Sequence, residues 1–543
     1  MPWNRRELLR TGLSSTLASC LTAAATGFGK TKKAEQEPGA ANSGASHDLL
    51  KTSDNLPAAA GLNMDTFAAG TRAAQITPTR RELDEMGGGF SSGPLFPGGA
   101  AAPLWARALA TRKGDQTLLL ITADLHSTPL WMSNEIRAEL SQRCHIPREA
   151  ISLCTSQTHS APYTSTNDRE QPYNKRLVRE LIEVGVMAIA DLRPAKIGAI
   201  KGYDHGLCYN QRLPITDEVP LEACPDRDRH RGGCMFARNH VLGRGGGRPV
   251  DHELGVLRID TLEGKPLAIV FHYNCHPATV IEGPSMHGDF SGFAAAKIEE
   301  SCPGTTAMFL QGSLADGHPR YFFTDVEHAR KNGLDLAHEV LRVLPEITTT
   351  DQVRMDFASE NFPVTLVPYP KERLKRLLTY FKDFVRELEK NPEACWIGAG
   401  PDTINLPPRF PAAARLNMVT PLIRYCETKL AVARDGEDEK LAPLEGEIQT
   451  FVWNDIALCL HNWEMFCQTG LEIKRLSPLR YTFPVGNSNS LVGYVAPQEE
   501  FDLGGYEVVT NPMYANMAGM RAPENTERII KRFMALLNAG AGS

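Results

Sequence analysis

Several short apolar runs in this 543-residue chain end in polar side chains that could do chemistry. These side chains are Asp124, His126, Gln157, His159, Asn274, His276, Ser313, Asp316 and Glu464. Imidazoles and carboxylates bind metal ions and transfer protons, so these residue types suit metal-assisted or acid–base hydrolysis. One such histidine usually only hydrogen-bonds a loop carbonyl, but several of them after successive runs favour a shared site.

The elements that would position these side chains follow from the spacing of apolar residues. Short apolar runs predict strands over 117–123, 150–155, 195–200, 254–260, 267–272, 307–311, 450–460 and 480–485. Helical periodicity predicts helices over 133–143, 171–191, 290–301, 325–343, 371–389 and 525–537. This alternation predicts an α/β fold: a large mixed sheet flanked by helices, with loop insertions over 203–250 and 390–447. Ligands of open α/β sheets bind beyond the carboxyl ends of strands, where the polar run ends would converge.

The composition argues against several classes of function. The chain has 58 Lys and Arg against 64 Asp and Glu, a formal net charge of −6 and no basic tract, so we expect no nucleic-acid partner. No apolar run reaches about 18 residues, so we expect no membrane-spanning helix. The 12 cysteines include no C-x-x-C pair, which argues against a cysteine-based zinc module.

The N-terminal residues resemble an export signal. Arg5 and Arg6 precede a weakly apolar stretch, and residues 1–30 are therefore similar to a Tat signal. Residues 17–20 resemble a lipobox, which would tether the protein to a membrane surface through Cys20. We expect residues 31–67 to form a disordered tether and residues 68–543 to form one α/β catalytic domain. We expect an exported protein, periplasmic or associated with the cell envelope; its oligomeric state stays open.

Motifs dispersed over residues 68–510 together resemble the neutral (non-lysosomal) ceramidase superfamily. They are the segments 70–78, 104–109 and 122–124, Thr158-His159-Ser160-Ala161-Pro162, Asn274-Cys275-His276-Pro277, Glu464 six residues before Gly470, Gly493-Tyr494-Val495 and Gly505-Tyr506-Glu507. Each motif is weak alone, and their order and spacing carry the resemblance.

The resemblance implies a site with one zinc ion, which activates water against an amide carbonyl. In that family two His, a Glu and a Tyr hold the ion, and the matching residues here are His276, Glu464 and Tyr494. The residues matched near the substrate are His159 and Tyr506, in catalytic roles, and Asn210 and Arg212, in substrate binding.

The chain departs from the family pattern at three places. Gln157 replaces the first zinc-binding His, and because its neutral amide is a poor zinc ligand we assign it to substrate binding. Either another histidine completes the metal site or the metal is weaker-bound or different; the candidate histidines are His126, His205 and His287. Gly312 replaces the active-site serine, with Ser313 one position late. After Tyr506 we expect a single helix and no C-terminal β-sandwich of the family type.

These patterns lead to one main hypothesis and two alternatives. The main hypothesis is an exported zinc-dependent hydrolase of amide or ester bonds that acts on a lipid-like or N-acyl small molecule. The first alternative is a degenerate homologue that binds a lipid or glycan in the same cleft, which Gln157 and Gly312 favour. The second is a serine hydrolase that uses Ser313 with His159 and Asp316.

Overall fold

The computed structural model describes residues 64–86, 95–164, 168–204, 206–214, 240–241, 249–281, 283–398, 402, 404–406, 410–432 and 441–541. The predicted export signal with Cys20, residues 31–63 of the predicted tether, and His205 lie outside these residues. No helix in the described part of the chain combines the length and apolar character that a membrane crossing needs.

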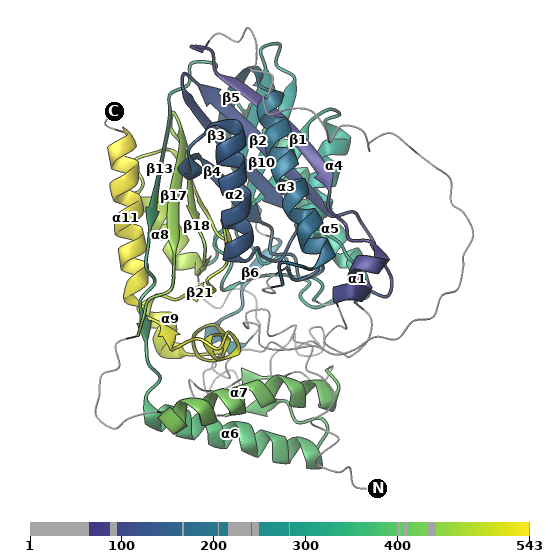
Figure 1. Ribbon diagram of the computed structural model, residues 1–543, viewed down its shortest axis with the longest axis vertical. Helices are drawn as coiled ribbons and strands as arrows, with labels where there is room; N and C mark the ends of the chain where they lie inside the picture. Colours follow the sequence, from purple (N-terminus) through teal and green to yellow (C-terminus); the bar gives the residue numbers. More distant parts are fainter. Residues whose placement is uncertain are drawn as a thin grey trace, which may run out of the picture.

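An eight-stranded mixed sheet forms the centre of the molecule (Figure 1). Its strand order is β11-β10-β9-β5-β1-β2-β3-β4, with β1 Ala68–Gln75, β2 Trp105–Lys113, β3 Gln116–Ala123, β4 Ile151–Thr155, β5 Arg193–Tyr203, β9 Glu253–Thr261, β10 Pro266–Tyr273 and β11 Thr306–Gln311. The pairs β3–β4 and β10–β11 are parallel, and the other neighbours are antiparallel. The predicted α/β fold with a mixed sheet is confirmed.

Both faces of this sheet are covered, because its strands are apolar on both sides. In β3, Leu119 and Ile121 pack with the helical layer, whereas Leu118 and Leu120 pack with a second sheet. The helical layer consists of α2 (Leu130–Cys144), α3 (Pro172–Ala190), α4 (Asp289–Ser301) and α5 (Val326–Val343). These four helices confirm the helices predicted from the periodicity.

The second sheet has the order β13-β17-β18-β20, with β13 Met355–Asn361, β17 Glu447–Trp453, β18 Ile456–His461 and β20 Tyr481–Val485. Its outer face packs against α8 (Cys467–Leu476) and α11 (Glu524–Ala541). The prediction of one strand over 450–460 is wrong, because β17 and β18 form a hairpin that turns at Asn454 and Asp455. Asn454 has a φ of 54°, a left-handed conformation that Asn adopts more readily than most residues.

Helices α6 (Lys371–Lys390) and α7 (Ala412–Val432) pack together at one end of the molecule (Figure 1). Helix α6 was predicted, but α7 lies in the segment predicted as a loop insertion, so that prediction is wrong over 412–432. The shorter elements are α1 Arg80–Met86, η2 Arg148–Ala150, β6 Cys208–Asn210, β7 Leu213–Pro214, β8 His240–Val241, β12 Gly317–Pro319, η4 Leu344–Glu346, β14 Leu366–Val367, β15 Trp396–Ile397, β16 Ile404–Asn405, β19 Glu464–Met465, β21 Tyr494–Val495, α9 Gln498–Leu503, η6 Tyr506–Thr510, α10 Asn511–Tyr514 and β22 Met520–Arg521.

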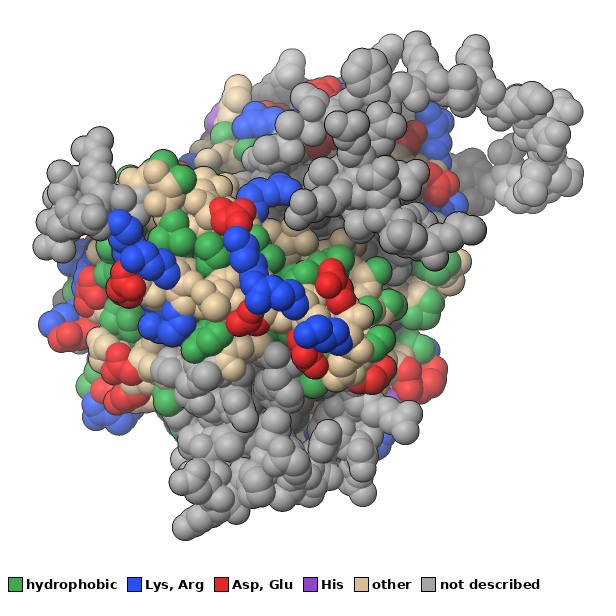
Figure 2. All heavy atoms as spheres, turned by 90° about the horizontal axis from the view of Figure 1, so that it is seen from below, with side chains coloured by type: hydrophobic (Ala, Val, Ile, Leu, Met, Phe, Trp, Pro, Cys, Tyr) green, Lys and Arg blue, Asp and Glu red, His purple; other side chains and the backbone are tan. Residues whose placement is uncertain are grey.

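The face at the α6–α7 end carries charges of both signs. Figure 2 shows Lys and Arg side chains interspersed with Asp and Glu over the described part of this face. Helices α6 and α7 carry exposed ion pairs, such as Lys375–Glu372 and Lys382–Glu427. Such pairs contribute little to stability, so this surface is a solvated one.

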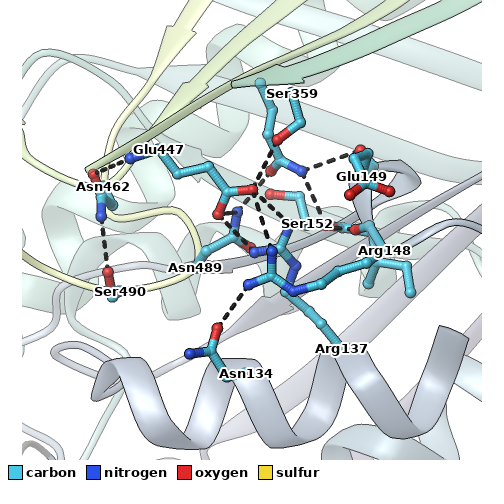
Figure 3. Close-up of polar contacts among 12 residues, drawn as sticks. Asn134, Arg137, Arg148, Glu149, Ser152, Ser359, Glu447, Asn462, Asn489 and Ser490 are labelled. Atoms are coloured by element: carbon cyan, nitrogen blue, oxygen red, sulfur yellow. Dashed lines mark hydrogen bonds and ion pairs between the residues drawn. The ribbon is translucent and has the colours of Figure 1, made fainter. Parts of the chain in front are cut away.

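A charge pair between a buried arginine and a half-buried glutamate joins the helical layer to the second sheet (Figure 3). Arg137 of α2 donates two hydrogen bonds, of 2.6 and 2.8 Å, to the Glu447 carboxylate of β17. Ser359 of β13 donates to the same carboxylate at 2.8 Å, and Asn489 donates to it at 3.3 Å. These bonds hold the two layers in register near the loop that follows β20.

Candidate functional site

The predicted site residues follow four strands of the main sheet. β3 leads to His126, β4 leads to Gln157 and His159, β10 leads to His276, and β11 leads to Ser313. The sheet curls, so that its edge strands β4 and β11 contact each other. The carboxyl ends of β3, β4, β10 and β11 therefore share one end of the molecule.

The loop after β20 closes this arrangement. The Gly486 amide donates to the Gln311 carbonyl at the end of β11, at 2.9 Å. The Thr155 amide at the end of β4 donates to the Asn487 carbonyl, at 3.2 Å. The same loop continues into β21, which carries Tyr494. It thus brings the second half of the predicted site beside the first.

His159 and His276 form a hydrogen-bonded pair. Their Nε2 atoms lie 2.9 Å apart, and the His159 amide donates to the Pro277 carbonyl at 3.2 Å. Burial lowers the pKa of His159 to about 4 and lowers the pKa of His276 well below its usual value, an effect that neighbouring histidines strengthen for His276. Both rings are therefore neutral at pH 7, and one Nε2 donates to the other.

Two more histidines extend this pair into a row. The His126 ring meets the His159 ring edge-on at 4.8 Å, and the His318 ring lies 5.1 Å from the His276 ring. The Tyr163 hydroxyl lies 3.5 Å from His159 Nδ1. Sequence reasoning missed His318, which lies in the short strand β12, although its place two residues after Asp316 could have singled it out.

Glu464 and Tyr494 form the other half of the site. They are paired residues of the parallel strands β19 and β21. Burial raises the pKa of Glu464 to about 7, and hydrogen bonds from the Gln157 and Tyr494 side chains partly offset this rise. Gln157 has a left-handed φ of 63°. This conformation directs the side chain at position 157 to Glu464, while His159 contacts His276.

The two halves of the predicted metal site therefore meet on the 157–159 segment. Among the described residues, no three His, Cys, Asp or Glu side chains form a group that could hold a metal ion. The donor set would instead combine His276 and Glu464 with the Tyr494 phenol and the Gln157 amide oxygen. His276 Nδ1, Glu464 Oε2 and Gln157 Oε1 are buried without a hydrogen-bond partner. A buried polar atom without a partner destabilises the folded protein. A cation bound by this nitrogen and these two oxygens would supply the missing partner.

The histidines considered as additional ligands differ in their surroundings. His126 belongs to the histidine row. His287 Nδ1 accepts a hydrogen bond from the Asp289 amide at 3.1 Å, and its ring packs 5.6 Å from the Phe293 ring. His287 is therefore engaged at the start of α4, and its ring faces that helix.

Tyr506 lies on the wall of the site next to Tyr494. It is the first residue of the π-helical turn η6, and its ring lies 5.9 Å from the Tyr494 ring. Its hydroxyl accepts a hydrogen bond from Asn511 Nδ2 at 3.4 Å. π-Helices are rare, occur mostly as single turns and are frequently found at functional sites. Tyr506, predicted to line the pocket, therefore contacts Tyr494, predicted to bind the metal.

Asn210 and Arg212 point into the protein interior. Asn210 Nδ2 donates to Asp316 Oδ2 at 2.8 Å and to the Pro249 carbonyl at 2.9 Å. The Arg212 guanidinium is buried between the carboxylates of Glu500 and Glu507. In this structure both side chains are engaged with the protein itself.

Ser313, His159 and Asp316 do not form a hydrogen-bonded triad. Ser313 Oγ is buried without a hydrogen-bond partner, and it faces α8 so closely that a Cβ at Gly470 would lie 2.1 Å from it. Asp316 accepts hydrogen bonds from the Cys467 amide at 2.7 Å and from Asn210. Burial raises the pKa of Asp316 to about 7. Its contacts are those of a residue that fixes the start of α8.

Comparison with known proteins shows which fold carries this arrangement. No family model and no curated protein sequence matches the chain. The crystal structure of neutral ceramidase from Pseudomonas aeruginosa matches with a TM-score of 0.58 and 15% identity, over 87% of this chain and 74% of that chain. A structure of ceramidase complexed with C2 matches with a TM-score of 0.60 and 16% identity, over 87% of this chain and 75% of that chain. This chain therefore has the fold of neutral ceramidase.

Proposed function

We propose that this protein is a ceramidase-like hydrolase that cleaves the amide bond of a lipid-like, N-acylated small molecule with the help of one bound zinc ion. One observation carries the proposal: the pair His159–His276 and the pair Glu464–Tyr494 meet on the 157–159 segment. The neutral ceramidase fold supports the substrate class, and an ester of the same shape would suit the same chemistry.

The zinc ion would be held by His276, Glu464 and Tyr494, with the Gln157 oxygen beside them. Bound there, it would bring the pKa of a water molecule toward ~7 and so supply a nucleophile at neutral pH. The atoms of His276, Glu464 and Gln157 that lack a hydrogen-bond partner support this assignment.

The protein's own residues would move the proton and orient the substrate. Because His159 is neutral at pH 7, its Nε2 can take up a proton and then return it to the leaving amine. The Tyr163 hydroxyl, 3.5 Å from Nδ1, would help to fix the orientation of this ring. The Tyr506 ring beside Tyr494 would orient the acyl part of the substrate.

The test is a metal analysis combined with an assay of the full-length protein. We expect about one zinc per chain and hydrolysis of N-acyl-sphingosines that stops with a chelator and returns with zinc. His276→Ala and Glu464→Ala should each lose both metal and activity, whereas His338→Ala, at an exposed position on α5, should keep both. Chelator-insensitive turnover, or a metal-free active protein, would refute the proposal.

A catalytically degenerate homologue that binds a lipid or glycan is a second candidate. The hydrogen bond between Gln157 and Glu464 favours it, because a neutral amide occupies the position that the family resemblance assigns to a metal ligand. Under this function the protein would bind N-acyl-sphingosine and leave it intact, with or without zinc.

We further propose that the protein is exported through residues 1–30 and is tethered through Cys20. The twin arginines and the lipobox-like residues support this location. Fractionation of cells that produce the wild type and Cys20→Ala would test it: the wild type should partition with membranes, and the variant should become a soluble exported protein.

A further inference from the structure

We propose that Arg212 is a positioning residue that fixes Tyr506 and ties it to the segment that carries Glu464. The proposal rests on the proposed function only for its effect on turnover. The tie itself consists of contacts among buried residues and can be tested without any substrate.

Within the described part of the chain, the Arg212 guanidinium donates hydrogen bonds to the segment that precedes and includes the start of η6. Nε donates to Glu500 Oε2 at 2.6 Å, and Nη1 donates to Glu507 Oε2. Nη2 donates to two backbone carbonyls, those of Glu500 at 3.2 Å and Gly504 at 2.9 Å. Glu507 directly follows Tyr506. The Arg212 side chain therefore hydrogen-bonds this segment both before and after Tyr506.

The backbone between α9 and η6 is flexible by itself and needs the hydrogen bonds from Arg212 to keep one conformation. Gly504 and Gly505 have φ values of 71° and 87°, which only glycine adopts readily. They link α9 to the π-helical turn, and the conformational freedom of glycine makes this link flexible. The hydrogen bond from Arg212 to the Gly504 carbonyl holds it in one conformation.

The residues next to Arg212 extend the tie to the other half of the site. Gln211 Nε2 donates to Glu507 Oε1 at 2.9 Å, and the Arg212 amide donates to Asn210 Oδ1 at 2.8 Å. Asn210 in turn donates to Asp316, which accepts from the Cys467 amide three residues after Glu464. Residues 210–212 therefore connect the strand of Glu464 with the turn of Tyr506.

The charges show that Arg212 cannot be replaced without consequence. Arg212, Glu500 and Glu507 are all buried, and Arg212 forms an ion pair with each of the two carboxylates. Without it, two buried carboxylates would repel each other across the link and push it open. A substrate contact would need the guanidinium to leave these partners, whereas a positioning role uses them as they are.

The experiment compares Arg212→Met, Arg212→Lys and the triple variant Arg212→Met/Glu500→Gln/Glu507→Gln, which removes the buried charges so that the fold survives. Arg137→Met is the control, because Arg137 is an equally buried arginine that pairs with a glutamate away from Tyr506. The probes are hydrogen exchange of residues 498–510 and the ¹⁹F resonance of Tyr506 in 3-fluorotyrosine-labelled protein, assigned with Tyr506→Phe.

We expect exchange over 498–510 to rise about tenfold in Arg212→Met and in the triple variant, less in Arg212→Lys, and not at all in Arg137→Met. The Tyr506 resonance should shift in the same three variants. On N-acyl-sphingosine, kcat should fall roughly 10- to 100-fold while KM changes little. Unchanged exchange and an unchanged Tyr506 resonance would overturn the proposal, as would a raised KM with normal exchange. An inactive wild type would refute only the proposed function. Hydrogen exchange and the fluorine shifts would still test whether Arg212 positions Tyr506.

Discussion

The Nε2 atoms of His159 and His276 lie 2.9 Å apart in a buried part of the protein, where both rings are neutral at pH 7. A neutral pair can share only one proton between these two atoms. One imidazole must therefore present a lone pair and the other an N–H group. If His276 held a cation through its unpartnered Nδ1, its Nε2 would carry the N–H group. His159 Nε2 would then present the lone pair that takes up a proton.

Replacing His159 with alanine should therefore separate proton transfer from metal binding. We expect His159→Ala to lower kcat by roughly 10²- to 10⁴-fold while the zinc content stays unchanged. Metal analysis and steady-state kinetics on the same preparation would measure both, with His338→Ala as the control. If His159→Ala loses its metal as His276→Ala does, His159 is itself a ligand.

Replacing Gln157 with histidine should strengthen metal binding. Imidazole is a better zinc ligand than an amide oxygen, and position 157 already points to Glu464. Its φ of 63° suits His, which is enriched in left-handed conformations. We expect Gln157→His to bind zinc about tenfold more tightly in a competition titration with a chromophoric chelator. Gln157→Asn keeps the amide and is the control; equal affinities for the two variants would contradict the prediction.

Replacing Gly312 with serine, the residue of the family pattern, should destabilise the protein and should not raise its turnover. A Cβ at Gly312 would lie 2.1 Å from Asn274 Oδ1 and 2.8 Å from His272 Nε2. Asn274 cannot easily move, because its Oδ1 accepts the Ser313 amide at 2.9 Å. We expect Gly312→Ser to lower the free energy of unfolding by about 1–3 kcal/mol, measured by urea denaturation.

Two variants control for this effect. Gly312→Ala adds the same Cβ without a hydroxyl and should be destabilised equally. Gly292→Ser, in α4, should be tolerated, because a Cβ there meets nothing closer than 3.8 Å. A stable Gly312→Ser protein with raised turnover would show that this loop can accept the serine of the family pattern.

The sequence predicted those elements whose apolar residues follow one period, and it failed where local signals conflict. Helix α7 contains Pro421, which usually breaks a helix, and carries Arg415 on its buried side. Arg415 is accommodated because it donates to the Phe410 carbonyl at 2.9 Å, a contact that the sequence cannot reveal. The sequence predicts one strand in place of the β17–β18 hairpin, because only Asn454 and Asp455 interrupt the apolar run.

The candidate site divides in the same way. His126, His159 and His276 could be predicted because each comes shortly after the end of its own strand. The hydrogen bond between Gln157 and Glu464 joins residues 307 positions apart, and the burial of Arg212 depends on two glutamates from near the end of the described chain. Such partners are set by how the second sheet packs on the first, which no local pattern encodes.

The buried His272 should make the protein sensitive to acid. It lies in β10, where its Nε2 donates to the Pro484 carbonyl at 2.7 Å, and burial lowers its pKa from 6.5 to about 3. Between these two pH values the unfolded chain binds a proton that the folded protein does not. Its contribution to stability is therefore present above pH 6.5 and is lost as the pH falls toward 3, by at most about 1.4 kcal/mol per pH unit.

His272→Gln should flatten this dependence, because glutamine can still donate to Pro484 but does not titrate. We expect the free energy of unfolding of the wild type to fall more than that of His272→Gln between about pH 7 and about pH 4.5, measured by urea denaturation at each pH. Comparing the two proteins cancels the opposing contributions of Asp316 and Glu464, whose pKa values are raised by burial. The exposed His338→Gln should follow the wild type. Parallel curves for the wild type and His272→Gln would mean that His272 takes up its proton without unfolding.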